Sequence, residues 1–112
     1  MDLKDLFQAF DRVPNVSATD QTLYSEFVKA GKSVEVEIFV AGDLTTANKT
    51  ITLGVERLNI KYPLYIAAAG ASGYSILLSR PVTIVSGERL YATIASCTLN
   101  DAIFIFARGK YL

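Results

Sequence analysis

The chain has 112 residues, of which 51% are hydrophobic and 20% are charged. This length predicts one domain, and the apolar content suffices for one hydrophobic core. Equal numbers of basic and acidic residues, 11 of each, give a formal net charge of zero. Zero charge argues against a nucleic-acid-binding protein, which needs a basic surface to neutralise phosphates, and it removes the self-repulsion that keeps proteins apart.

No apolar run reaches the ~18 residues of a membrane span. The N-terminal sequence also lacks the basic-then-apolar layout of a signal peptide. We therefore expect a chain that is made in a cytosol and has no membrane partner. The lone Cys97 cannot form an internal disulfide, and we expect it to be a small buried side chain on a strand.

The first 14 residues predict a short amphipathic helix. Pro14 should end it, and apolar side chains recur at the helical spacing i, i+3, i+4, i+7, i+10: Leu3, Leu6, Phe7, Phe10 and Val13. A helix this short is marginal alone, so it must dock either on its own domain or on a partner. The predicted organisation is an amphipathic helix at 1–14 and a single β-sandwich domain at 15–112.

After a polar link, the pattern is that of short strands separated by turn residues. The predicted strands are 23–30, 33–41, 50–55, 58–61, 64–69, 74–79, 82–85, 89–95 and 102–108. Strands at this spacing predict an all-β fold, an antiparallel β-sandwich or jelly roll of about eight strands.

Three of these strands carry more specific expectations. The alternation in 33–41 predicts Val34, Val36, Ile38 and Val40 on one face, with Glu35, Glu37 and Phe39 on the other. Segment 64–69 is apolar on both faces, which predicts a buried or covered strand. Phe104 and Phe106 lie opposite Ile103 and Ile105, which predicts a strand that is central or packed against another subunit.

The residues that usually carry catalysis are scarce. The chain has no histidine and one cysteine, so we expect no zinc or other metal site and no cofactor. Glu35 and Glu37 could in principle form a carboxylate pair, but a solvated strand face explains them better. Asn100-Asp101 reads as a turn rather than a calcium loop. We therefore expect a protein that is not an enzyme.

The aromatic residues say more about function than the charged residues do: the chain has six tyrosines and no tryptophan. Tyrosine combines a large apolar ring with a polar tip, which suits subunit interfaces, although a sugar-binding site would use it as well. Exposed tyrosines gathered at a loop end would indicate a binding module, whereas tyrosines at a subunit seam would indicate a structural protein of an assembled particle.

The segment T-I-V-S-G-E-R-L-Y-A-T-I at 83–94, followed by a polar turn and A-I-F-I-F-A-R-G at 102–109, resembles a pattern in small virion proteins of tailed bacteriophages. In those proteins a V-x-x-G-x-R-L-x-A strand pair precedes a final hydrophobic strand ending near glycine. The resemblance covers about a quarter of the chain and does not include the predicted helix. It implies a capsid decoration (cement) protein, or a related sandwich domain, that assembles as trimers or other symmetric oligomers on a particle.

These observations predict a structural virion protein, most simply a cement protein that binds the major capsid protein or another virion protein and stabilises the particle. The alternative is a receptor- or carbohydrate-binding module of a phage tail or fibre. We expect a homo-oligomer, with a trimer favoured. Small side chains at 67–69 would allow a close approach leading into Gly70, so the candidate partner-binding residues are Leu3, Leu6, Phe7, Phe10, Ala67, Ala68, Ala69 and Tyr111.

Overall fold

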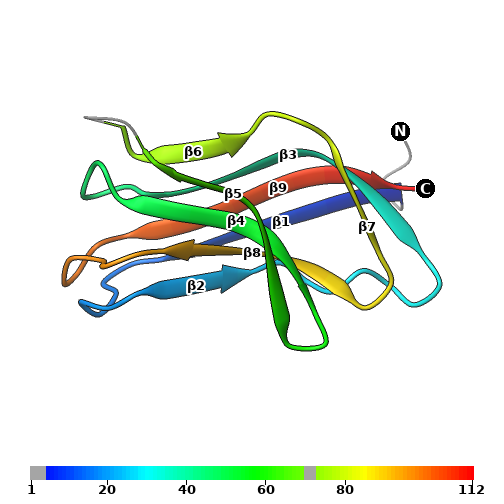
Figure 1. Ribbon diagram of the computed structural model, residues 1–112, viewed down its shortest axis with the longest axis horizontal. Coiled ribbons are helices and arrows are strands. Elements are labelled where there is room, and N and C mark those ends of the chain that lie inside the picture. The colour runs from blue at the N-terminus through cyan, green and yellow to red at the C-terminus, as the bar shows by residue number, and fades with distance from the viewer. Residues whose placement is uncertain (1–4, 70–72) are drawn as a thin grey trace.

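The computed structural model describes residues 5–69 and 73–112 and confirms the predicted all-β sandwich (Figure 1). One antiparallel sheet, sheet A, has the order β1-β9-β3-β6, with β7 pairing the other half of β3; sheet B has the order β2-β8-β4-β5. The strands of the described residues are β1 (Leu6–Val13), β2 (Gln21–Tyr24), β3 (Ser33–Asp43), β4 (Thr50–Arg57), β5 (Ile60–Ala68), β6 (Ser75–Leu78), β7 (Val82–Val85), β8 (Glu88–Ile94) and β9 (Ile103–Tyr111).

The hydrophobic core lies between the two sheets, because alternate residues of each strand point inward. Ile51 and Leu53 of β4 and Ile103 and Ile105 of β9 are completely buried. Burying one such side chain contributes about 1.5–3 kcal/mol relative to leaving it exposed. In an antiparallel sandwich this arrangement leaves each sheet with an outer face, which can meet either water or a partner.

The predicted N-terminal helix is wrong for the described residues. β1 pairs with β9 in an unbroken antiparallel register over its whole length. Phe7 and Ala9 point into the core, while Phe10 is 65% exposed, so the side chains follow a period of two and not of 3.6. Backbone pairing with β9 and burial of Phe7 outweigh the weak local helix preference. Leu3 lies outside the described residues.

A β-bulge in β3 changes the predicted faces of that strand. The register with β9 shifts between Val36 and Ile38, and such a shift moves the following side chains to the other face. Phe39 and Ala41 therefore join Val34 and Val36 in the core, whereas Ile38 is 41% exposed. The prediction that put Ile38 and Val40 on the same face as Val34 and Val36 is wrong beyond the bulge.

Segments 58–61 and 64–69, predicted as two strands, form one long strand after a tight turn. This strand, β5, is the edge of sheet B. Segment 64–69 was expected to be buried or covered, but Tyr65 and Ile66 are 42% and 58% exposed. The physical reason is position, since an edge strand has a neighbour on one side only.

β9 is central, between β1 and β3, as its apolar pattern predicted. The two strands before it, β7 and β8, follow one another through the Ser86–Gly87 turn but lie in different sheets, so the segment is a crossover and not a hairpin. Over residues 5–69 and 73–112, no helix is long and apolar enough to span a membrane.

Candidate interaction surface

The outer face of sheet A carries apolar side chains in register across four strands. Phe10 of β1 is paired with Phe106 of β9, Phe106 with Val40 of β3, and Val40 with Leu77 of β6. We call these four residues the outer row. Phe10 is 65% and Leu77 53% exposed, while Phe106 and Val40 are half-buried. The outer row is thus an apolar band on a face that is usually polar in antiparallel sheets.

Two features place the outer row. The bulge near Ile38 turns Val40 outward, and the unbroken β1–β9 register sets Phe10 beside Phe106. The two phenylalanine rings pack edge to face, with centroids 6.4 Å apart and planes at 69°. This geometry suits the ring quadrupoles and gives the exposed Phe10 a defined position on the sheet.

The predicted partner-binding residues do not form one site. Phe10 belongs to the outer row, but Phe7 is buried and its ring meets Tyr111 edge to face at 6.1 Å. Phe7 is therefore a core residue, and Tyr111 packs partly against the core. The structure places the others as follows: Leu6 and Ala67 half-buried, Ala68 exposed and Ala69 buried. Gly70 and Leu3 lie outside the described residues.

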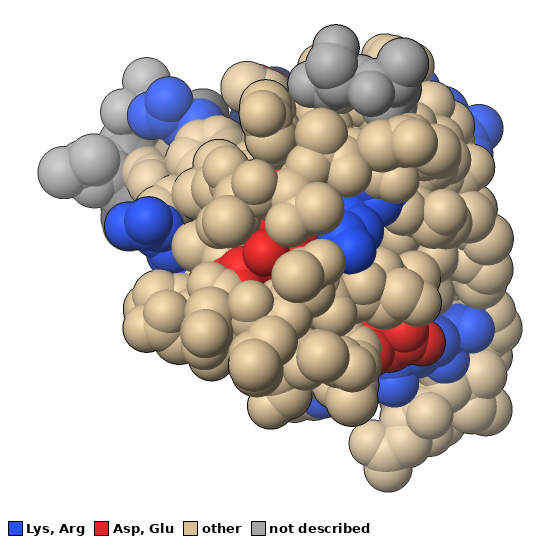
Figure 2. Space-filling view, turned by 90° about the vertical axis from the view of Figure 1, so that its left-hand side faces the viewer, with Lys and Arg blue, Asp and Glu red and all other residues tan. Residues whose placement is uncertain are grey.

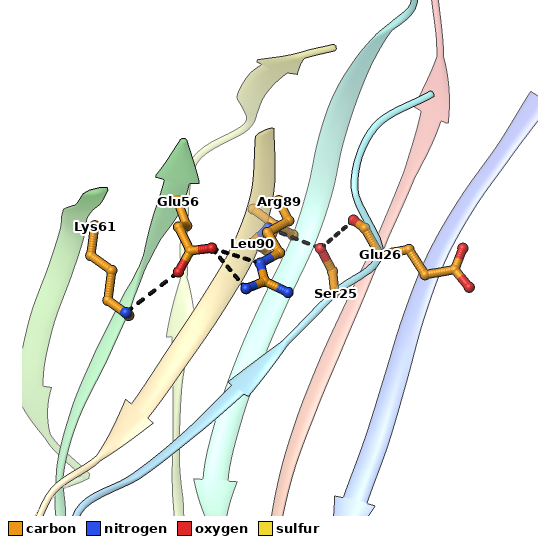
Figure 3. Close-up of polar contacts among 6 residues, drawn as sticks. All are labelled: Ser25, Glu26, Glu56, Lys61, Arg89 and Leu90. Atoms are coloured by element: carbon orange, nitrogen blue, oxygen red, sulfur yellow. Dashed lines mark hydrogen bonds and ion pairs between the residues drawn. The ribbon is translucent and has the colours of Figure 1, made fainter. Parts of the chain in front are cut away.

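Sheet B has a different outer face, on which one carboxylate lies between two cations. Figure 3 shows Glu56 of β4 between Lys61 of β5 and Arg89 of β8. The Arg89 Nε and Nη2 atoms lie 2.9 and 2.7 Å from Glu56 Oε1, and Lys61 Nζ lies 3.4 Å from Oε2. Burial alone would raise the pKa of Glu56, but the hydrogen bond and charge of Arg89, followed by those of Lys61, lower it.

Aromatic rings complete this cluster. The Arg89 guanidinium carbon lies 3.7 Å from the centroid of the Tyr24 ring and 4.5 Å from that of Phe27. Arg89 thus connects Glu56 with two rings. Beside it, the Ser25 hydroxyl accepts from the Leu90 N–H and donates to the Glu26 carbonyl, both at 2.9 Å (Figure 3). The charged groups of the cluster are satisfied by each other, which indicates a structural tie across sheet B.

Two buried carboxyl groups lie at the end of the sandwich that carries connections 14–20, 44–49 and 95–102, which we call the loop end. Asp43 Oδ1 accepts from the backbone N–H groups of Thr45 and Thr46, each at 2.9 Å. Asp101 accepts from the Thr46 hydroxyl at 2.7 Å and from the Thr98 N–H at 3.0 Å. The second oxygen of Asp43, Oδ2, is buried without such a partner.

The pKa values of these two carboxyl groups are shifted in opposite directions. Burial raises the pKa of Asp43 and the neighbouring Asp101 adds to the effect, whereas at Asp101 the hydrogen bonds from Asp43, Thr46 and Thr98 outweigh the effect of burial and lower the pKa. Two ionised carboxylates here would repel each other, so the protonation of one carboxyl group depends on that of the other. Asn100 and Asp101 form a turn, as predicted, with Asn100 at φ 70°.

Neither carboxyl site brings together a metal-ligand set. Among residues 5–69 and 73–112, no three His, Cys, Asp or Glu side chains are grouped closely enough to hold a metal ion. Figure 2 shows the loop end covered mainly by uncharged residues, with only small separate basic and acidic groups. Sequence reasoning missed both the Glu56 cluster and the Asp43–Asp101 pair. The Glu56 cluster could have been predicted only from the strand register, which pairs Glu56 with Lys61 of β5 and with Arg89 of β8.

Comparison with known proteins adds little to this geometry. No protein-family model matches the chain, and no curated protein matches it. One solved structure of similar arrangement is the NLP core of Drosophila, whose description refers to pentamer formation and histone binding. The two chains are 11% identical with a TM-score of 0.46, over 96% of this chain and 97% of that one. A likeness at this level supports no conclusion about the present chain.

Proposed function

We propose that this chain is a structural virion protein without enzymatic activity, which forms a homo-oligomer and binds a coat subunit through the outer face of sheet A. A capsid cement protein is the specific form of the proposal, and a trimer is its proposed assembly. The resemblance of segments 83–94 and 102–109 to tailed-phage virion proteins supports the particle assignment. In this proposal the protein acts at the surface of the virion after synthesis in the host cytoplasm.

The observation that carries the proposal is the outer row. An apolar band spanning four strands, with Phe10 and Leu77 more than half exposed, favours contact with another protein over contact with water. Zero net charge leaves no overall repulsion against such contact. A sheet face is also rigid, so docking through it costs little ordering entropy.

The tyrosines favour an assembly interface over a binding module. Tyr62 and Tyr65, 51% and 42% exposed, lie along the edge strand β5, while Tyr91 is buried. Tyr74, 49% exposed, precedes β6. Two of these three exposed tyrosines therefore follow a sheet edge, which is the distribution expected of a subunit interface.

Binding to purified particles of the source virus tests the proposal. Leu77→Lys places a charge in the outer row and should abolish co-sedimentation with particles, because burying an unpaired ammonium group is costly. Leu99→Lys is the matched control, since Leu99 is 63% exposed in the β8–β9 connection, away from the outer row, and it should bind normally. Equal binding of both variants would reject the outer row as the binding surface, and absence of the wild-type chain from particles would reject the function. A wild-type chain that binds host-cell glycans instead would favour the receptor-binding alternative.

A further inference from the structure

The turn between β4 and β5 breaks a conformational rule that the rest of the described chain obeys. Leu58 and Asn59 both have positive φ, 52° and 63°, as in the two-residue hairpin turn that favours Asn-Gly. At the other positive-φ positions of residues 5–69 and 73–112 the side chains are small or polar: Asn15, Asn48, Asn100, Ser96, Gly31 and Gly87. A bulky apolar residue in this conformation is strained.

The described residues bury little of the Leu58 side chain. It is 82% exposed, more than any other large apolar residue described, and Ile60 and Tyr62 beside it are 54% and 51% exposed. In Figure 1 the β4–β5 hairpin extends away from the body of the sandwich at the lower edge of the view. Local rules are most often broken at functional sites, so Leu58 is a candidate for contact with another molecule. We call residues 57–60 the hairpin tip.

A surface cleft elsewhere on the subunit can accept an apolar side chain. A cleft of about 310 Å³ lies between β5 and the segment that follows β6, lined by Leu64, Tyr65, Leu78, Ser79 and Arg80. Leu64 and the buried Leu78 make its floor apolar, so it can hold a leucine side chain. Arg80 adds donors that can meet the carbonyl oxygens and the Asn59 amide oxygen of a turn.

The hairpin tip cannot reach the cleft of its own subunit. Leu58 and Leu64 are six positions apart along the same hairpin arm, which at ~3.3 Å per residue separates them by about 20 Å. A tip-to-cleft contact must therefore join two copies.

We propose that Leu58 of one copy inserts into the β5–β6 cleft of the next, so that the hairpin tip is the connector of the homo-oligomer. This inference rests on the homo-oligomer of the proposed function and names its contact. The contact is heterologous, because it joins two different surfaces of the same chain. Repeated around a rotation axis, it closes a ring, of which a trimer is the smallest form beyond a pair.

The Leu58→Asn variant distinguishes the effect of the strained turn conformation from the effect of the contact made by the leucine side chain. Asparagine tolerates positive φ, so the turn should still form while the apolar side chain is removed. The same variant should sediment as a monomer at concentrations where the wild type is oligomeric. Leu99→Asn, an exposed leucine outside the tip, should leave the oligomer intact. A Leu58→Asn variant that remains fully oligomeric would overturn the inference, whatever its Tm.

Disulfide trapping identifies the partner surface directly. A mixture of the Leu58→Cys and Ser79→Cys variants should form a 58–79 disulfide on mild oxidation, while the native Cys97 is buried. Disulfides found only between two copies of Leu58→Cys would show a tip-to-tip contact and overturn the inference. An oligomer that persists without any 58–79 disulfide would reject this contact and leave the proposed function standing. A wild-type chain that is monomeric both in solution and on particles would reject the homo-oligomer itself.

Discussion

Asp43 and Asp101 form a buried carboxyl pair in which folding raises the pKa of Asp43 and lowers the pKa of Asp101. Thr46 joins them, since its backbone N–H donates to Asp43 and its hydroxyl donates to Asp101. The pair holds the end of β3, the loop after it and the turn before β9 together at the loop end. The two opposite pKa shifts make the stability of this end depend on pH.

The sign of this dependence follows from the two pKa directions. The pKa of Asp43 is raised on folding, so its contribution is fully present below the unfolded value and is lost as pH rises through the raised value. The pKa of Asp101 is lowered, so its contribution is present above the unfolded value and is lost as pH falls through the lowered value. The pair is therefore most stabilising between the lowered pKa of Asp101 and the raised pKa of Asp43.

Asp43→Asn should abolish the loss of stability that the wild type shows as pH rises through the pKa of Asp43. The amide keeps an acceptor for Thr45 and Thr46 and a neutral donor for Asp101, so the fold should persist. Between the unfolded pKa and the raised folded pKa of Asp43, the wild-type free energy of unfolding should fall by up to about 1.4 kcal/mol per pH unit, and the variant should show no such fall. Urea unfolding at a series of pH values measures both. Asp11→Asn, at an exposed position of β1, is the control; an unchanged slope in Asp43→Asn would contradict the raised pKa of Asp43.

Substitutions of Phe7 and Phe10 test whether this segment forms strand β1, as in the structure, or the helix that the sequence predicted. A helix would put both on one apolar stripe, whereas the strand buries Phe7 and exposes Phe10. Phe7→Ala should cost about 3–5 kcal/mol of unfolding free energy, and Phe10→Ala at most about 0.5 kcal/mol. Denaturant unfolding of the two variants provides the comparison. Similar losses for both would contradict the β1 register.

Arg89 is expected to matter more for stability than other arginines. Arg89→Met leaves Glu56, which is 3% exposed, with Lys61 alone, and it removes the cation that stacks on Tyr24. Its Tm should fall below that of Arg108→Met, a variant at an exposed position of β9. Adding Glu56→Gln to Arg89→Met should recover part of the loss, because the unpaired charge is then gone. If the double variant is as unstable as the sum of the single variants, the Glu56–Arg89 pair is not the cause.

Gly54 is required for the packing of Tyr91 on sheet B. A Cβ atom at position 54 would lie 2.5 Å from the Tyr62 carbonyl oxygen and 2.6 Å from Cε1 of the Tyr91 ring. Gly54→Ala should therefore displace the ring and the edge strand and cost about 1–3 kcal/mol. Thermal unfolding, with the near-ultraviolet tyrosine circular dichroism as a local probe, measures the effect. An unchanged spectrum and Tm would show that β5 moves aside without cost.

The sequence predicted the sandwich because alternating apolar residues and turn pairs are local signals. The strand at 82–85 was located correctly at both ends, and the apolar β9 was correctly expected to be central or covered. β1 was missed because its apolar residues also fit a helical period, and only pairing with β9 decides between the two. The bulge near Ile38 was missed because it depends on the register of two strands that are distant in sequence.

The candidate surfaces were less predictable than the fold for the same reason. Phe10 was selected as a contact residue from a wrong helix, and it lies in the outer row because three other strands bring Phe106, Val40 and Leu77 beside it. Leu58 carried no signal in the sequence, since its strain is visible only once both φ angles of its turn are known.

Hydroxyl-radical footprinting of the chain, free and bound to purified particles, tests the central claim most directly. Phe10 and Phe27 are both more than half exposed, 65% and 52%, but Phe10 is in β1 of sheet A whereas Phe27, in the β2–β3 connection, packs against Arg89 of sheet B. If the outer face of sheet A is the assembly surface, particle binding should protect Phe10 and leave Phe27 labelled as in the free chain. Labelling of Phe10 that is unchanged on binding would contradict the claim.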